Sequence, residues 1–194
     1  MPQPRKRNQI YWQSLYQYLW IIAALWGVEI VDRLFFGNRL EGLGLQPGNW
    51  THWEGIFLAP LLHGGWGHLL SNSIGLAILG AIILVRGWRV LLRVSIYAII
   101  VGGLFVMFVA GNGSIHIGAS GVVYGYWAYI IGLGFYERTG TSILWAIVII
   151  IVYGGFVYGM FPSEANSITR ISWQGHLGGA LGGFFAAKQL RKNG

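Results

Sequence analysis

The sequence predicts an all-α membrane protein: a bundle of six transmembrane helices with both termini in the cytoplasm. Its composition is the first indication, because 55% of the 194 residues are hydrophobic and only 10% are charged, whereas a typical soluble domain carries about 25% charged residues. The second is a series of apolar segments close to the ~20 residues that span a bilayer as a helix. The third is the distribution of Lys and Arg around those segments. Since the alternation typical of a β-barrel is missing, we expect helices to be the spanning structure.

Six apolar segments are the expected spans, at residues 15–36, 66–85, 90–110, 117–136, 142–161 and 171–187. Near the N-terminus, no small-residue cleavage site follows a short apolar core, so we interpret the first segment as a retained helix. We therefore expect a basic cytoplasmic segment at 1–14, a single transmembrane domain at 15–190 and a cytoplasmic tail at 191–194. The longest loop, at about 37–65, falls on the outer side.

The positive charges set the predicted orientation. With six spans, one side of the membrane holds ten of the 13 Lys and Arg residues and the other side holds three. The ten are Arg5, Lys6, Arg7, Arg86, Arg89, Arg93, Arg138, Lys188, Arg191 and Lys192, and the three are Arg33, Arg39 and Arg170. Because cytoplasmic loops carry the excess of positive residues, both termini are expected in the cytoplasm. The same basic rim accounts for the net charge of +7 through contact with lipid headgroups, and we expect no nucleic-acid partner.

Several chemistries are excluded or not indicated. The chain has no cysteine, which excludes disulfides, thiolate metal sites and a cysteine nucleophile. We expect no cofactor and no metal ion. The oligomeric state cannot be read from the sequence.

Four polar residues fall at similar depths in the even-numbered segments. His68 and Asn72 lie near the start of segment 66–85, Ser120 lies about one turn into 117–136, and His176 lies one to two turns into 171–187. These three segments all run inward from the outer side, and polar groups inside such spans are candidate functional sites because they are costly there. A helix rises ~1.5 Å per residue, so the four side chains are expected near one level.

Glycines predict how these segments meet. Gly121, Gly125 and Gly132 form a small-residue seam beside Ser120, while Gly179 and Gly183 share a helix face with His176. Small residues let membrane helices approach closely, which would bring Ser120 within reach of His176. A serine hydroxyl becomes nucleophilic when a base takes its proton, so these residues predict a Ser-His dyad without an acid.

An oxyanion formed at such a dyad needs hydrogen-bond donors. We assign them to His68, the Asn72 amide and the backbone N–H of Ser120. Tyr124, four residues after the serine, is a candidate to pack on the dyad. The α/β-hydrolase elbow is excluded, because Val122 replaces its second glycine and no strand precedes the serine.

These motifs together resemble the rhomboid family of intramembrane serine proteases. The resemblance rests on "HGGWGHLLSN" (63–72), "GASGVVYG" (118–125) and "GHLGGALGG" (175–183), which occur in the family's order. It implies a six-helix rhomboid domain with Ser120 as nucleophile, His176 as general base, and His68, Asn72 and the Ser120 amide as the oxyanion hole. Gly118, Gly121 and Gly179 would support the site together with Tyr124.

The resemblance also implies a water-filled cavity open to the outside and transmembrane protein substrates cut near their outer ends. We expect a multi-pass protein of the bacterial inner membrane with its active site facing outside. One departure concerns the outer loop, where the family usually has Trp-Arg before the histidine motif and this chain has Trp53-Glu54.

Two other functions stay open at this point. One is a non-catalytic rhomboid-like protein that binds membrane clients, although such relatives are expected to lose the serine or the histidine. The other is a metal or ion transporter that uses His63, His68, His116 and His176. Taken singly, His63 is expected to be structural, and His52 and His116 are expected to be loop residues.

Overall fold

The computed structural model describes residues 4–163 and 171–191, with side chains from residue 8 onward. Of the sequence predictions, those on Arg170, Lys192 and most of the tail lie outside the described residues, as do the side chains of Arg5, Lys6 and Arg7. The described chain is mostly helical, and its only extended pairing is one antiparallel bridge between Leu45 and His116.

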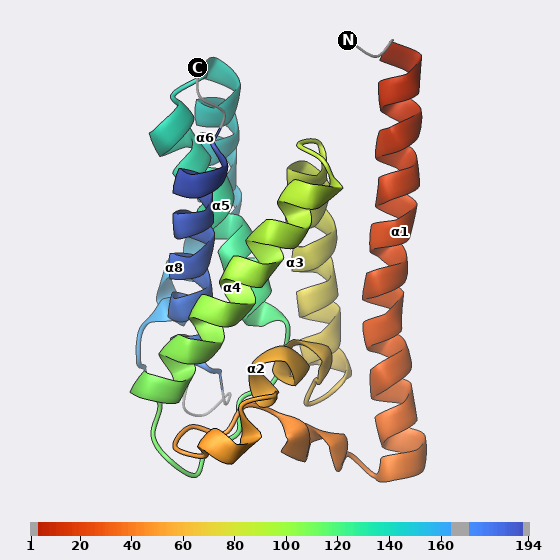
Figure 1. The fold of residues 1–194 in the computed structure, drawn as a ribbon, viewed down its shortest axis with the longest axis vertical. Coiled ribbons are helices and arrows are strands. Elements are labelled where there is room, and N and C mark those ends of the chain that lie inside the picture. Colours follow the sequence, from red (N-terminus) through yellow and green to blue (C-terminus); the bar gives the residue numbers. More distant parts are fainter. Residues whose placement is uncertain (1–3, 164–170, 192–194) are drawn as a thin grey trace.

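Within residues 4–163 and 171–191, the fold has six long α-helices and one short one (Figure 1): α1 (Pro4–Val31), α2 (Gly55–Leu58), α3 (Trp66–Leu84), α4 (Trp88–Val109), α5 (Ser120–Glu137), α6 (Gly140–Tyr153) and α8 (Trp173–Leu190). A π-helical turn at Asp32–Phe36 extends α1. Short 3-10 helices cover Leu40–Leu43, Trp50–His52, Ala59–Leu61 and Gly154–Met160.

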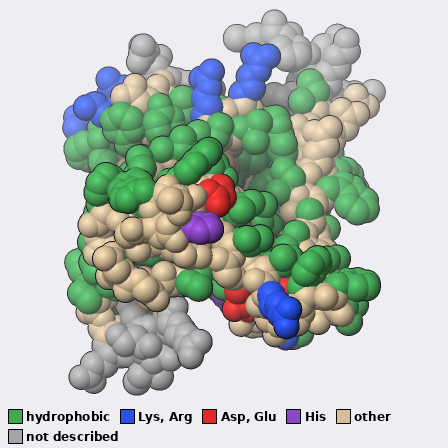
Figure 2. Space-filling view, turned by 60° about the horizontal axis from the view of Figure 1, so that its bottom comes forward, with side chains coloured by type: hydrophobic (Ala, Val, Ile, Leu, Met, Phe, Trp, Pro, Cys, Tyr) green, Lys and Arg blue, Asp and Glu red, His purple; other side chains and the backbone are tan. Residues whose placement is uncertain are grey.

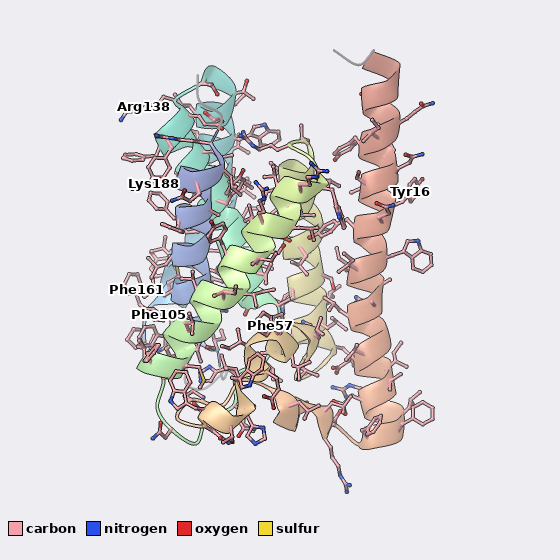
Figure 3. The ribbon with its side chains drawn as sticks, viewed as in Figure 1. Tyr16, Phe57, Phe105, Arg138, Phe161 and Lys188 are labelled. Carbon is pink, nitrogen blue, oxygen red and sulfur yellow. The ribbon has the colours of Figure 1, made fainter. Side chains whose placement is uncertain are left out.

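Helix α8 packs chiefly against α5 and α4, while α1 stands at the side of the bundle next to α3 (Figure 1). The chain begins and ends at the same end of the bundle. Arg138 and Lys188 lie toward that end, and Phe57 and Phe161 lie toward the other (Figure 3). A chain that crosses a bilayer an even number of times has its two ends on the same side, which is the arrangement here.

Three helical stretches are long and apolar enough to cross a membrane by length and composition: Trp66–Leu84, Trp88–Val109 and Gly140–Met160. All three lie within two residues of the predicted segments 66–85, 90–110 and 142–161. The remaining long helices contain more glycine, tyrosine or charge. The predicted count of six spans goes beyond this criterion and stays a prediction.

The predicted glycine seam is present between α5 and α8. A Cβ atom built on Gly179 would collide with the backbone of Gly121, and one on Gly183 would collide with Gly125. The two backbones are therefore in direct contact, as small residues allow in membrane helices. Gly132 differs slightly, because it faces Ala187 and Phe184 instead of another glycine.

Helix α8 also uses glycines toward α4, which was not predicted. A Cβ on Gly178 would meet Phe105 at 2.6 Å and Gly102 at 3.0 Å, and one on Gly182 would strike the backbone of Tyr97. Helix α8 thus has one glycine face toward α4 and another toward α5. Both faces allow its backbone to contact the neighbouring helix directly.

Three helix boundaries differ from the predicted segments. Helix α5 begins at Ser120 and not at 117, because Gly118 adopts φ +109° and keeps the preceding segment out of the helix. Helix α6 gives way at Gly154 to a 3-10 helix before 161. Helix α1 starts at Pro4, so most of the predicted segment 1–14 is helical.

The outer loop covers the end of the bundle opposite the termini. Its residues Leu45, Ile56 and Ala59 form a small apolar core with Val106 and Met107 of α4. Figure 2 turns this end forward and shows mainly apolar and uncharged groups, with few charged side chains. The loop is thus packed onto the C-terminal end of α4.

Candidate active site

Ser120 and His176 form a direct hydrogen bond between two helices. Ser120 is the first residue of α5, and His176 lies in the first turn of α8. The Ser120 Oγ to His176 Nε2 distance is 2.8 Å. The glycine contacts between α5 and α8 lie directly beyond this pair, so the close approach of the helices brings the two side chains together.

The second ring nitrogen of His176 defines the tautomer. Its Nδ1 lies 2.9 Å from the carbonyl oxygen of Gly159. A carbonyl oxygen only accepts, so Nδ1 carries the hydrogen and Nε2 presents its lone pair to the serine hydroxyl. The imidazole is therefore in the form that can accept the proton of Ser120, although no carboxylate among residues 4–163 and 171–191 is bonded to it.

Aromatic rings fix the plane of the imidazole. Tyr124 stacks on His176 with ring centroids 4.0 Å apart and an interplanar angle of 11°. Phe156 stacks on the other face of Tyr124 at 4.6 Å. The sequence indicated Tyr124 as a packing candidate, whereas Gly159 and Phe156 were missed because they come from the 3-10 helix that replaces the end of the predicted segment 142–161.

His68 and Asn72 lie close against Gly118, two residues before Ser120, where a side chain would collide with the His68 ring. A Cβ built on Gly118 would lie 2.5 Å from the His68 ring and 3.3 Å from Asn72 Nδ2. Asn72 is 4% exposed, and its Nδ2 has no hydrogen-bond partner among the described residues. Because an unpaired buried amide is costly, this donor is one that a ligand oxygen would satisfy.

The backbone N–H of Ser120 is a further donor at this place. In a helix the first amides have no intrahelical partner, and the earliest bonds in α5 run from Val122 and Val123 to Ala119. The later start of α5, compared with the predicted segment, therefore leaves the Ser120 amide available.

A cavity of about 60 Å³ lies on the α4 side of Ser120. Its polar lining comes from Ser120, His116 and Ser172, and its apolar lining includes Ile56 and Val106. A volume of this size has room for a few water molecules. It is bounded by the outer loop, α4, α5 and the start of α8.

The remaining histidines are separate from the dyad. His63 is buried with its ring 5.2 Å from that of His68, and burial, together with the neighbouring His68, lowers the pKa of His63 to about 4. His116 lies in the loop before α5, where burial also lowers its pKa. Among residues 4–163 and 171–191, no three His, Asp or Glu side chains are grouped to hold a metal ion.

The outer loop is anchored without the Trp-Arg pair. Glu54 lies 3.2 Å from His52, and both side chains are exposed. Backbone bonds hold the loop instead: Leu45 exchanges two of 2.9 Å with His116, and Gly118 N–H donates to Ala59 O at 2.8 Å. The loop is thus tied to the segment that leads into Ser120.

Comparison with known proteins shows the family of the chain. The protein-family model of the rhomboid domain matches residues 49–193 of the sequence. Uncharacterized proteins of Mycobacterium bovis and Mycobacterium tuberculosis are each 36% identical over 177 residues, which cover 89% of this chain and 73% of each relative. An uncharacterized protein of Mycobacterium leprae is 34% identical over 177 residues, covering 89% of this chain and 69% of its own. With a match across most of its length, the chain belongs to the rhomboid family.

Proposed function

We propose that this protein is an intramembrane serine protease that hydrolyses a peptide bond in or near transmembrane segments of membrane proteins. Rhomboid family members are generally proteases of this kind, although the family includes inactive members. The observation that carries the proposal is the 2.8 Å bond from Ser120 Oγ to His176 Nε2, with Nδ1 held by the Gly159 carbonyl. An inactive relative has no need of a serine and a histidine in this geometry.

In the first step, Ser120 Oγ attacks the carbonyl carbon of the scissile bond while His176 Nε2 takes the hydroxyl proton. The imidazolium that forms has two N–H groups, and the Gly159 carbonyl accepts from Nδ1. Stacking on Tyr124 holds the ring in plane throughout. General base catalysis by a positioned side chain contributes about 10²- to 10⁴-fold.

The negative charge that develops on the substrate oxygen is stabilised by donors near Gly118 and Ser120. We assign this role to Asn72 Nδ2, the His68 ring and the Ser120 backbone N–H. A single donor of this type is worth about 10²- to 10³-fold in kcat. The buried Nδ2 of Asn72, which has no partner among the described residues, is the strongest support for this assignment.

The tetrahedral intermediate then collapses as His176 donates its proton to the leaving amine, which leaves an acyl group on Ser120. A water molecule attacks that acyl carbon, His176 takes the water proton, and the same proton returns to Ser120 Oγ as the acid product departs. The cavity of about 60 Å³ beside Ser120 supports water supply at this step.

We also propose six spans with both termini in the cytoplasm, in the inner membrane of a bacterium. The shared end of the first and last helices supports an even number of passes. The active site then faces outside, and helical transmembrane substrates are cut near their outer ends. Because the chain has no cysteine, single cysteines at Thr51→Cys and Gly140→Cys report the two sides. An impermeant maleimide added to whole cells is expected to modify only the first.

Cleavage of a transmembrane reporter tests the activity. Wild-type protein and the variants Ser120→Ala and His176→Ala are reconstituted with a reporter in proteoliposomes. We expect cleavage by the wild type and none above background by either variant. The matched control is His52→Ala, which removes an exposed histidine of the outer loop and is expected to cleave normally.

Two results would contradict the proposal. Unchanged cleavage by His176→Ala would exclude His176 as the base. Absence of cleavage by the wild type across reporters, together with stable co-purification of an uncleaved membrane protein, would favour the client-binding alternative.

A further inference from the structure

A second histidine–serine hydrogen bond joins the starts of the same two helices. His116 Nδ1 lies 2.6 Å from Ser172 Oγ. His116 comes four residues before Ser120, and Ser172 comes four residues before His176. Each pair therefore joins the segment at the start of α5 to the segment at the start of α8, and the two pairs are four residues apart along both segments. In the first pair the α5 segment supplies the serine, whereas in the second pair it supplies the histidine.

Hydrogen-bond partners define the protons of this second pair. Ser114 Oγ donates to the Gly111 carbonyl at 2.8 Å, so it accepts from His116 Nε2 at 2.9 Å. Burial lowers the pKa of His116, which favours the neutral imidazole. The neutral ring then accepts at Nδ1, and the Ser172 hydroxyl donates to it.

Ser172 is also the N-cap of α8. Its Oγ accepts the backbone N–H of Gly175 at 3.1 Å, which is the usual role of a serine at this position. The same oxygen therefore belongs both to the first turn of α8 and to the loop that leads into α5. Moving either segment changes the geometry of both bonds.

His116 is itself held by the outer loop. Its backbone N–H and carbonyl both bond to Leu45 at 2.9 Å. The imidazole thus extends from an anchored backbone to the start of α8. A chain of short contacts runs from the outer loop through His116 and Ser172 to the helix that carries His176.

The glycine seam alone does not fix the register of α5 and α8. Contact between glycine backbones limits how closely the helices approach, but such small surfaces present few obstacles to sliding or tilting. A directional hydrogen bond across the ends of the helices resists both motions, because its strength falls steeply with distance and angle.

We propose that His116 and Ser172 form a positioning pair that holds the starts of α5 and α8 in register and thereby keeps Ser120 and His176 in reactive geometry. This inference rests on the proposed function. Neither residue touches the reacting atoms in this role. Loss of the pair lowers the rate of the chemical step and leaves substrate binding unchanged.

The test measures the rate at which a fluorophosphonate labels Ser120, and kcat and KM for a transmembrane reporter, in detergent-purified full-length protein. The variants are His116→Phe, which fills the space of the ring, Ser172→Ala, and the double variant. Since displacement by about 1 Å costs up to ~100-fold, each single variant is expected to lose about 10- to 100-fold in labelling rate and kcat, with unchanged KM. The double variant is expected to be no slower than the slower single variant, because the residues act as one unit.

Two controls separate positioning from helix stability. Ser172→Thr keeps the hydroxyl and is expected to retain the wild-type rate. Thr139→Ala removes the N-cap of α6, whose Oγ accepts from Ser142 N–H at 3.2 Å. It causes a comparable capping loss at the other end of the bundle and is expected to leave labelling of Ser120 unchanged.

Three outcomes overturn the inference. Wild-type rates in His116→Phe and Ser172→Ala would show that the pair positions nothing, and multiplied losses in the double variant would show that the residues act separately. A loss in Thr139→Ala equal to that in Ser172→Ala would assign the effect to helix stability. If the wild type itself is not labelled, the proposed function fails and the positioning role fails with it, whereas a labelled wild type with unaffected variants refutes the positioning role alone.

Discussion

Replacement of Gly179 by alanine tests whether the glycine seam sets the geometry of the dyad. A Cβ at this position would collide with the Gly121 carbonyl oxygen and lie 2.7 Å from its carbonyl carbon, whereas ordinary contact begins at 3.4 Å, so α5 and α8 must separate by at least about 0.7 Å. The dyad bond of 2.8 Å would lengthen to at least about 3.5 Å, beyond the ~3.0 Å typical of a hydroxyl hydrogen bond. We expect a loss of kcat approaching ~100-fold and of about 1–3 kcal/mol in stability from overpacking.

The assay is reporter cleavage in proteoliposomes, with unfolding in detergent as the stability measurement. The matched control is Gly27→Ala in α1, where an added Cβ meets nothing within 4 Å. Alanine is favoured over glycine in helices by about 1 kcal/mol, so this control is expected to retain activity and to be at least as stable. Full activity of Gly179→Ala would refute the reasoning that the seam sets the distance between Ser120 and His176.

Three further predictions concern single residues around the site. Asn72→Ala is expected to lower kcat by about 10²- to 10³-fold with little change in KM, and an equal rise in KM alone would contradict the oxyanion role. Gly159→Ala places a methyl group against the Tyr124 hydroxyl and 3.3 Å from His176 Nδ1, so labelling of Ser120 is expected to slow, and an unchanged rate would contradict orientation by this segment. His63 has a folded-state pKa of about 4, below its unfolded value of about 6.5. Its contribution to stability is therefore present above pH 6.5 and is lost as the pH falls toward 4, by up to about 1.4 kcal/mol per pH unit. Equilibrium unfolding of His63→Leu is expected to show a correspondingly weaker dependence on pH in this window, and identical slopes would contradict the assignment.

The helices could be predicted where the sequence is uniformly apolar. Helices α3 and α4 match segments 66–85 and 90–110 closely, because apolar length and flanking glycine or arginine define both ends. The starts of α5 and α8 were less well placed. They depend on a positive φ at Gly118 and on a serine cap at Ser172, which are local backbone features that hydropathy does not contain.

The pairing of Ser120 with His176 was predictable because small residues and polar residues occupy matching positions on two segments. Stacking by Tyr124 followed from helical spacing. The Gly159 carbonyl was not predictable, since the direction of a backbone carbonyl depends on the change from α-helix to 3-10 helix at Gly154. A glycine pair within an apolar run was the only sequence signal for that change.

The contacts that anchor the outer loop could not be predicted from the sequence either. In the sequence, the departure at Trp53-Glu54 was the visible feature of this loop. The loop is held mainly by backbone bonds of Leu45 and Ala59 to the segment before α5. Backbone pairing of this kind carries no side-chain signature. For the same reason, His116 was expected to be only a loop residue, although it joins that segment to the cap of α8.

The central claim is that His176 activates Ser120 as a nucleophile. Its most direct test is reaction of the detergent-purified protein with a fluorophosphonate, followed by mapping of the modified residue by mass spectrometry. We predict a single adduct on Ser120 that is absent from Ser120→Ala and strongly slowed in His176→Ala. An adduct that persists in Ser120→Ala, or an undiminished rate in His176→Ala, would contradict the account.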